Sequence, residues 1–241
     1  MTDARAALES LAGRSLSMLE DGVVELTPVA NAHYDRIGRA YDPLIRTNAY
    51  NRIVWRSSPA AYRAFAERMF ESRREGAHVE LGCGGLAFTS HLYREDRGRS
   101  VILIDQSLTM LRIARRRLAD RDGRLPSHVV LARGDARELR VSTGIGSTVL
   151  AMLVLHVLDD GAGFLSTLNA LADPEHATVG VASIFRGGTR RGDAWLHVFE
   201  ATRELTGRSL SEIERMMSAA IPGSLRTETS GSMGFLTVVR G

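Results

Sequence analysis

The chain has 241 residues, 44% of them hydrophobic, which is enough for one sizeable core with extensions. No apolar run reaches the roughly 18 residues of a transmembrane helix, and the start lacks a secretory-signal pattern. The only cysteine, Cys83, excludes an internal disulfide and a cysteine-rich zinc site. We therefore expect a cytoplasmic protein. The net charge is +3 and all 31 basic residues are arginines; the densest cluster, at residues 112–124, fits a solvated helix face better than a nucleic-acid patch.

The first third of the chain predicts helices rather than strands. Residues 4–19 have a helical pattern, residues 32–56 are rich in aromatic side chains, and Ser58 with Pro59 begins a further helix. We expect residues 1–75 to form an N-terminal helical lid or extension, and residues 76–241 to form the core domain.

The rest of the chain alternates between apolar runs and helical patterns. Continuous apolar strands that alternate with helices predict a parallel sheet covered on both faces. Near the end, Ser209 to Glu212 form a capping box, and residues 226–229 and 235–239 form a hairpin around a Ser-Gly-Ser turn. The fold class is therefore α/β, a Rossmann-like, doubly wound, mostly parallel sheet with a C-terminal antiparallel hairpin. The apolar runs are residues 77–81, 101–104, 129–132, 148–155 and 177–185, and the predicted helices between them include residues 108–118, residues 164–171 and one around His91 after the first run.

Glycines and acids follow the first three strands. Gly82 and Gly84 come directly after the first strand, where glycine lets the backbone approach a ligand. Asp105 ends the second strand, where a carboxylate can accept ribose hydroxyls, and Asp135 after the third strand can accept an adenine amino group. The spacing of Gly82, Gly84 and Ala87 also fits a dinucleotide fingerprint, so a nicotinamide cofactor is the alternative.

Together these motifs resemble the class I S-adenosylmethionine-dependent methyltransferases over roughly residues 30–241. Within that class the chain is similar to the small-molecule branch that includes the ubiquinone and menaquinone biosynthesis C-methyltransferases. One departure is Leu86, which stands where many members have a third glycine. The carrying segments are Glu80 to Gly84, Ile104 to Ser107 with Met110 and Leu111, Gly134 to Ala136, Leu155 to Leu158, the closing hairpin, and the paired steps Tyr34-Asp35 and Tyr41-Asp42.

The resemblance implies S-adenosyl-L-methionine as cofactor and S-adenosyl-L-homocysteine as product. Glu80 before the glycines, the acid after the third strand and the closing hairpin all oppose the dinucleotide alternative. Aromatic faces can stabilise a sulfonium, and Arg46 can pair with the methionine carboxylate. The expected cofactor-binding residues are Glu80, Gly82, Cys83, Gly84, Asp105, Gln106, Met110, Gly134, Asp135, Ala136 and Ala151, with Tyr41 and Arg46 from the N-terminal segment.

His156 is the candidate catalytic base, because it follows the fourth strand and its ordinary pKa lies near neutrality. The alternative is that it only shapes the pocket. We expect Tyr34, Tyr50, Trp55 and Phe185 to bind the substrate, although packing of the N-terminal segment and of the core explains them equally well. No metal-binding pattern is present, so we expect no metal.

The predicted function is methyl transfer to an oxygen, carbon or nitrogen atom of a small molecule, and the arginine-rich composition suggests secondary metabolism. The fourth strand reads Ala151-Met152-Leu153-Val154, without the Asn/Asp-Pro-Pro-Tyr/Phe signature of exocyclic-amine nucleic-acid methylases. An RNA methyltransferase and a protein that uses the cofactor for a non-methylating reaction are the alternatives. We expect no membrane partner and no nucleic-acid partner, and the oligomeric state stays open, with a homodimer among the alternatives.

Overall fold

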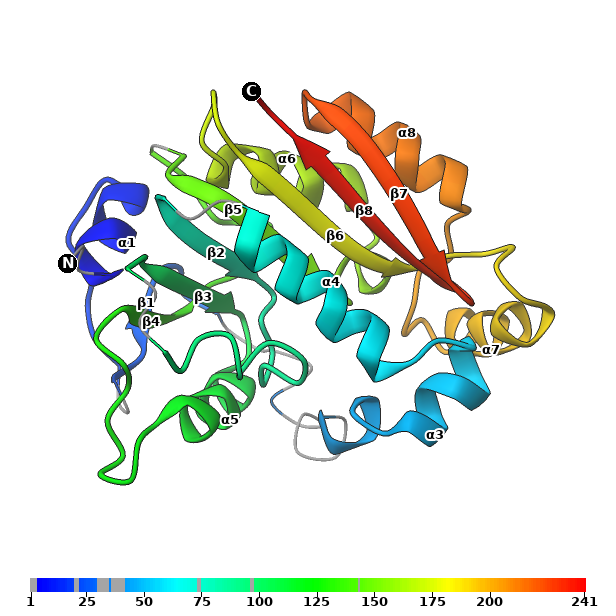
Figure 1. Cartoon of the computed structure of the whole chain (residues 1–241), viewed down its shortest axis with the longest axis horizontal. Coiled ribbons are helices and arrows are strands. Elements are labelled where there is room, and N and C mark those ends of the chain that lie inside the picture. Colours follow the sequence, from blue (N-terminus) through cyan, green and yellow to red (C-terminus); the bar gives the residue numbers. More distant parts are fainter. Residues whose placement is uncertain are drawn as a thin grey trace.

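One sheet organises the chain (Figure 1). The computed structural model describes residues 4–19, 22–29, 35, 42–72, 75–95, 98–142 and 144–241. Within these residues the sheet has eight strands in the order β1-β4-β3-β2-β5-β6-β8-β7. From β2 the next strands in the chain, β3 and β4, are added on one side of the sheet, and the following strands, β5 and β6, are added on the other side. The strand order therefore reverses between β2 and β5. In open α/β sheets such a reversal leaves a crevice at the carboxyl ends of the strands.

The predicted strands are confirmed with small changes at their ends. The central strands pair in parallel, and β8 pairs antiparallel with both β6 and β7 to form the expected terminal hairpin. The chain therefore has the Rossmann-like, mostly parallel fold. The strands are β1 (Val24–Glu25), β2 (Ala77–Leu81), β3 (Val101–Asp105), β4 (Val129–Arg133), β5 (Gly146–Met152), β6 (Thr178–Ile184), β7 (Ser224–Ser230) and β8 (Met233–Val239).

Helices cover both faces of the sheet. Side chains alternate along each strand, so Val79 and Leu81 enter one core cluster while Leu103 and Leu150 enter the other. The first cluster includes α1 (Ala4–Ala12), α6 (Gly161–Leu171) and α8 (Leu210–Ala220); the second includes α4 (Pro59–Ser72), α5 (Leu108–Leu118) and part of α7 (Arg190–Ala201). In Figure 1, α4 crosses in front of the sheet and α6 and α8 lie behind it. None of the helices in the described part of the chain has the length and apolar character needed to cross a membrane.

The described part of residues 1–75 makes several contacts with the sheet. The side chains of Leu8 and Leu11 on α1 are fully buried, and β1 adds a parallel strand beside β4. The first helix is shorter than the predicted residues 4–19, because Gly13 at φ +65° ends it in the left-handed conformation. Helix α3 (Asn48–Tyr50) and the π-helical turn η2 (Asn51–Trp55) then lead towards α4.

The connection from β2 to β3 differs from the prediction. We expected a helix around His91, but residues 82–95 form a succession of turns. Long-range contacts fix this segment instead: Phe88 and Leu92 are buried in the core, and the side chains of Thr89 and Tyr93 reach Glu80 on β2. Tertiary packing thus overrides the local helical pattern.

Candidate active site

A pocket opens at the carboxyl ends of β2, β3, β4 and β5, where the strand order reverses. Its cavity volume is about 120 Å³. Most of the cofactor-binding residues that the sequence predicts line this pocket. They are Glu80, Gly82, Cys83, Gly84, Asp105, Gln106, Met110, Gly134, Asp135 and Ala136.

The glycine loop after β2 needs its glycines. Gly82 and Gly84 have φ angles of +72° and +54°, which side-chain-bearing residues rarely adopt. A Cβ atom on Gly82 would also collide with the side chain of Val154 on the opposite wall. The backbone N–H groups of Gly82 and Cys83 both donate to the carbonyl of Ile104 at 2.8 and 3.1 Å, which ties the loop to β3.

Asp105 joins this loop to the turn after β3. Its Oδ2 accepts the N–H of Gly84 at 2.8 Å, and its Oδ1 accepts the N–H of Ser107 at 2.8 Å. Burial raises the pKa of Asp105 to about 6, although the two backbone hydrogen bonds act in the opposite direction. Each carboxylate oxygen can accept a further hydrogen bond, so the group can also bind ligand hydroxyls.

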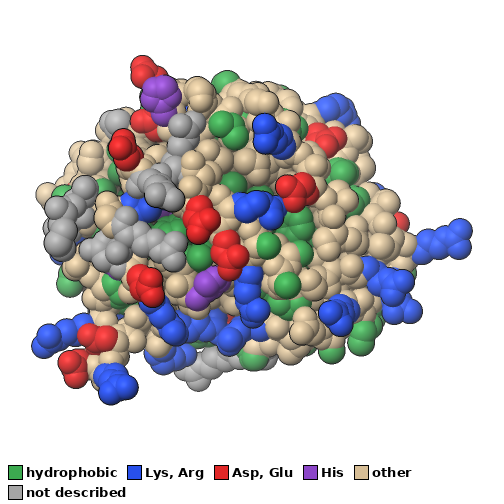
Figure 2. Space-filling model, in the orientation of Figure 1, with side chains coloured by type: hydrophobic (Ala, Val, Ile, Leu, Met, Phe, Trp, Pro, Cys, Tyr) green, Lys and Arg blue, Asp and Glu red, His purple; other side chains and the backbone are tan. Residues whose placement is uncertain are grey.

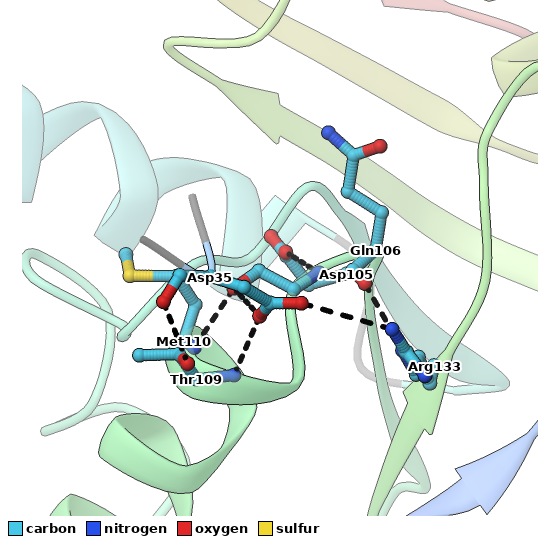
Figure 3. A network of polar contacts seen from close by, with 7 residues as sticks. Asp35, Asp105, Gln106, Thr109, Met110 and Arg133 are labelled. Carbon is cyan, nitrogen blue, oxygen red and sulfur yellow. Dashed lines mark hydrogen bonds and ion pairs between the residues drawn. The ribbon is translucent and has the colours of Figure 1, made fainter. Parts of the chain in front are cut away.

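Asp35 holds the other side of the same turn (Figure 3). Its Oδ1 accepts hydrogen bonds from Ser107 Oγ at 2.7 Å and from the N–H of Thr109 at 3.0 Å, at the beginning of α5. Arg133 at the end of β4 lies 3.7 Å from Asp35 Oδ2, and its Nε donates to the carbonyl of Gln106 at 3.2 Å. In the sequence, the only feature that points to a role for Asp35 is its place in the Tyr34-Asp35 step.

Asp42, from the second Tyr-Asp step, forms a largely buried ion pair with Arg117 on α5. The guanidinium of Arg117 contacts both carboxylate oxygens and also donates to the carbonyl of Gly85 in the glycine loop. A side chain at Gly85 would collide with Asp42. Because Ile45 lines the pocket, this ion pair holds one wall of the site against the loop.

Glu80 lines the pocket from β2 and is buried. Its Oε2 accepts a hydrogen bond from the Tyr93 hydroxyl at 2.8 Å, and Thr89 Oγ1 lies at 3.5 Å from Oε1. Burial nevertheless raises the pKa of Glu80 to about 7, and the nearby charge of Asp105 acts in the same direction. A cation placed in the pocket would favour the ionised form of this carboxyl group and so lower its pKa.

Asp135 has a different environment. Its side chain pairs with Arg137, which lowers the pKa of Asp135, and its backbone N–H donates to Thr27 Oγ1 at 2.9 Å. The Arg137 side chain is 63% exposed. Asp135 is therefore ionised and faces the pocket, but it already has a partner that a ligand amino group must share or displace.

Several predicted residues lie away from the pocket lining. Trp55 and Phe185 are buried in the core, and the Trp55 ring packs on Phe199 with centroids 5.9 Å apart. Tyr50 is half-buried and Arg46 is exposed. None of these four lines the described pocket, and neither does Ala151, which is buried in mid-strand. Tyr34 and Tyr41 lie outside the described residues.

His156 is buried and is also absent from the pocket lining in the described chain. Its Nδ1 accepts the N–H of Ile184 at 3.2 Å, so the neutral ring carries its proton on Nε2. Burial lowers the pKa of His156 to about 3. This environment favours a structural role for His156 at the end of β6 over acceptance of a proton from the substrate.

Sequence reasoning missed the apolar wall of the pocket. Most of these residues lie at or just after the carboxyl end of β5 or in the turns after the glycine loop, while Leu81 ends β2 and Ile45 comes from the N-terminal segment. Their position is their only signal in the sequence. Leu153 has φ +62°, an uncommon backbone conformation for a non-glycine residue that often marks functional sites. The apolar residues are Ile45, Leu81, Ala87, Phe88, Met152, Leu153, Val154, Val157 and Leu158.

The chemistry of the lining discriminates between cofactors. Three carboxylates (Glu80, Asp105 and Asp135) line the pocket, and the described lining contains no arginine or histidine. A pyrophosphate would face these acids, and the turns after the glycine loop offer it no α-helix N-terminus. A ligand with hydroxyls, an ammonium and a sulfonium fits the same groups. Within the described residues no cluster of three or more His, Cys, Asp or Glu side chains is arranged to hold a metal ion.

Comparison with known proteins agrees with a fit to S-adenosylmethionine rather than to a dinucleotide. Residues 79–176, somewhat less than half of the chain, match the family model described as a methyltransferase domain. No curated protein sequence matches the chain.

Solved structures share the fold at low sequence identity. A SAM-dependent methyltransferase of Thermotoga maritima, described as a possible histamine N-methyltransferase, is 17% identical with a TM-score of 0.61, covering 86% of this chain and 98% of its own. DhpI in complex with SAH is 20% identical with a TM-score of 0.60, covering 87% and 94%. Human N-acetylserotonin methyltransferase in complex with SAM is 11% identical with a TM-score of 0.60, covering 89% and 60%.

Residues 79–176 therefore match a methyltransferase domain, and the pocket lining has groups that fit S-adenosylmethionine.

Proposed function

We propose that the protein transfers a methyl group from S-adenosylmethionine to a small, largely apolar acceptor that carries no negative charge. We also infer that it belongs to the small-molecule branch of these enzymes. The observation that carries the proposal is the position of Asp105, which is buried at the pocket, bonded to the glycine loop and still able to accept two ligand hydroxyls.

Each pocket residue has a role in this proposal. Asp105 accepts the ribose hydroxyls, Asp135 accepts from the adenine edge, and Glu80 faces the ammonium of the methionine part. The glycine loop passes under the ligand without side chains to obstruct it. The bound cofactor supplies a methyl group that a positively charged sulfur activates towards in-line displacement.

The apolar wall after β5 supports the acceptor class. Met152, Leu153, Val154, Val157 and Leu158 provide apolar surface, and no basic side chain in the described lining would offset the charge of a carboxylate or phosphate. The described lining also offers no neutral histidine as a base, so alignment and exclusion of water carry the reaction. The acceptor atom must then already be a good nucleophile.

A small molecule is favoured over a nucleic acid for the same reason. Acidic side chains line the pocket, and on the face seen in Figure 2 basic and acidic side chains are interspersed rather than separated. The phosphodiester backbone of a nucleic acid needs a continuous basic surface.

A matched acceptor screen tests the proposal. Purified protein is given S-adenosylmethionine with aryl amines, phenols and the corresponding aryl carboxylates, and release of S-adenosylhomocysteine is measured. We expect turnover within the amine series, because a neutral amine needs no base, and none with the carboxylates or with phenols, which are weak nucleophiles until they lose a proton. Turnover confined to carboxylates, phosphates or RNA would contradict the proposed acceptor class.

A further inference from the structure

The Tyr93 hydroxyl lies between two side chains of the first central strand. His78 and Glu80 are two residues apart on β2, so they project from the same face of the sheet. The Tyr93 oxygen is 2.8 Å from His78 Nε2 and 2.8 Å from Glu80 Oε2. All three side chains are buried, but only Glu80 lines the cofactor pocket.

The hydrogen positions follow from the chemistry of the three groups. An ionised carboxylate can only accept, so Tyr93 donates its one proton to Glu80 and must accept from His78 Nε2–H. The remaining His78 nitrogen, Nδ1, is then an acceptor without a proton. In the described part of the chain this buried atom has no hydrogen-bond partner, as expected if no proton is placed there. The chain of bonds is therefore polarised towards an anionic Glu80.

Other groups hold this chain of bonds in place. His128 Nε2 donates to the Tyr93 carbonyl at 3.1 Å, and the rings of His78 and Tyr93 both pack edge-on against Phe70 of α4. Burial and the charge of Arg99 lower the pKa of His78, so the ring stays neutral. The charged group that acts on Glu80 is Asp105, at the end of β3, and its negative charge raises the pKa of Glu80.

We propose that Tyr93, held by His78, is a positioning residue that keeps the Glu80 carboxylate ionised and oriented towards the ammonium of the cofactor. This inference rests on the proposed function, because it needs Glu80 to face a bound cation. It assigns to the turns between β2 and β3 a role in cofactor affinity, although the Tyr93 side chain does not line the pocket.

Cofactor affinity should then depend on pH in a way that Tyr93 controls. With the pKa of Glu80 at about 7, the acidic form, which binds a cation poorly, accumulates as the pH falls. Loss of a hydrogen bond to a charged acceptor raises that pKa by about one unit. The Tyr93→Phe variant should therefore bind as wild type does at about pH 9 and roughly tenfold more weakly at about pH 6.

The experiment measures the dissociation constant of S-adenosylhomocysteine by calorimetry across this pH range. The quantity compared is the dissociation constant of the variant divided by that of wild type at the same pH. Ionisation of the ligand and of Asp105 affects both proteins alike and cancels in this ratio. Tyr62→Phe is the matched control: Tyr62 is also a fully buried tyrosine in the same core cluster, and its hydroxyl is not part of the chain of bonds that leads to Glu80.

We expect a ratio for Tyr93→Phe that grows as the pH falls, and a ratio of one at every pH for Tyr62→Phe. A Tyr93→Phe ratio that is constant with pH would overturn the inference, since it would mean a structural role alone. If Tyr93→Phe fails to fold, His78→Leu removes the donor that holds Tyr93; it should give a ratio that also grows as the pH falls but is smaller, because Tyr93 can still donate to Glu80. No binding by wild type would instead overturn the proposed function, so the two failures are distinguishable.

Discussion

The backbone N–H of Gly84 donates a hydrogen bond to Oδ2 of Asp105 over 2.8 Å. This bond connects the glycine loop after β2 to the acid that ends β3, so the two sequence motifs form one structural unit. The conformation of the loop and the orientation of the carboxylate therefore depend on each other. Asp35 and Asp42 extend this unit to α5 and to the N-terminal segment.

Leu86 gives a prediction about stability. It occupies the position of the third glycine with φ +59°, and its side chain is buried. Its left-handed backbone costs about 1–2 kcal/mol, which burial of the side chain offsets. Leu86→Gly relieves this strain whereas Leu86→Ala keeps it, so we expect the alanine variant to be less stable by about 1 kcal/mol in urea unfolding.

That order is the reverse of the usual one, in which glycine costs roughly 0.5–1 kcal/mol more than alanine. Leu92 is the control, because it is buried in the same segment without a positive φ angle. At Leu92 the glycine variant should be the less stable one. The same order at both positions would show that strain at Leu86 is negligible.

Removing one partner of the buried ion pair between Asp42 and Arg117 should destabilise the protein far more than removing one partner of an exposed pair. Its side chains are 4% and 17% exposed, so Asp42→Asn leaves a largely buried guanidinium without its counter-ion. We expect a loss of about 3 kcal/mol in the free energy of unfolding. Because Ile45 lies close in sequence and lines the pocket, S-adenosylhomocysteine should also dissociate faster.

The exposed pair of Arg68 with Glu228 provides the comparison, with side chains 52% and 67% exposed. Glu228→Gln should cost less than about 1 kcal/mol. Equal losses for the two substitutions would mean that Asp42 does not act as a buried charge.

Glu80 should make the cofactor-free protein less stable as the pH rises. Its pKa is about 7 in the folded protein against an ordinary value of 4.5, so the folded state binds the proton more tightly than the unfolded state. This contribution is present below the unfolded pKa and is lost as the pH rises through about 7. Glu80→Gln keeps an acceptor for Tyr93 without the charge.

We therefore expect Glu80→Gln to gain roughly 1–3 kcal/mol relative to wild type between about pH 5 and pH 8, measured by urea unfolding without cofactor. Its affinity for S-adenosylhomocysteine should fall at the same time. A stability difference that does not change with pH would contradict an elevated pKa for Glu80.

His156 should be dispensable for proton transfer. A general base contributes about 10²–10⁴-fold to the rate, but a ring with a pKa of about 3 that accepts the Ile184 N–H is poorly suited to this task. We expect His156→Asn, which keeps an acceptor, to have kcat within about threefold of wild type, well short of the contribution of a base. A loss of about a hundredfold in a variant with unchanged melting temperature would restore His156 as the base.

The sequence predicted those parts of the site that depend on local order along the chain. A glycine-rich turn or an acid at the end of a buried strand is visible in a few neighbouring residues, and the parallel sheet brings these strand ends to one edge. This explains why residues such as Gly82, Asp105 and Asp135 line the pocket as expected.

The remaining parts depend on contacts between distant segments, which no local pattern records. The Asp42–Arg117 pair and the contact of Tyr93 with Glu80 exist only because the N-terminal segment and the turns after β2 dock on α5 and β2. The predicted helix around His91 was wrong for this reason. Aromatic residues such as Trp55 carry no signal that separates core packing from ligand binding, and the structure places Trp55 in the core.

The assignment of the pocket to S-adenosylmethionine is tested most directly by a calorimetric titration with S-adenosylhomocysteine, with NADH as control, on wild type and Asp105→Ala. Asp105 accepts charge-assisted hydrogen bonds, each worth about 1.5–3 kcal/mol, so its loss should weaken binding by at least about tenfold. We predict that wild type binds S-adenosylhomocysteine and not NADH, and that Asp105→Ala binds it more weakly while remaining folded. Binding of NADH alone, or unchanged affinity in the folded variant, would contradict the assignment of this pocket.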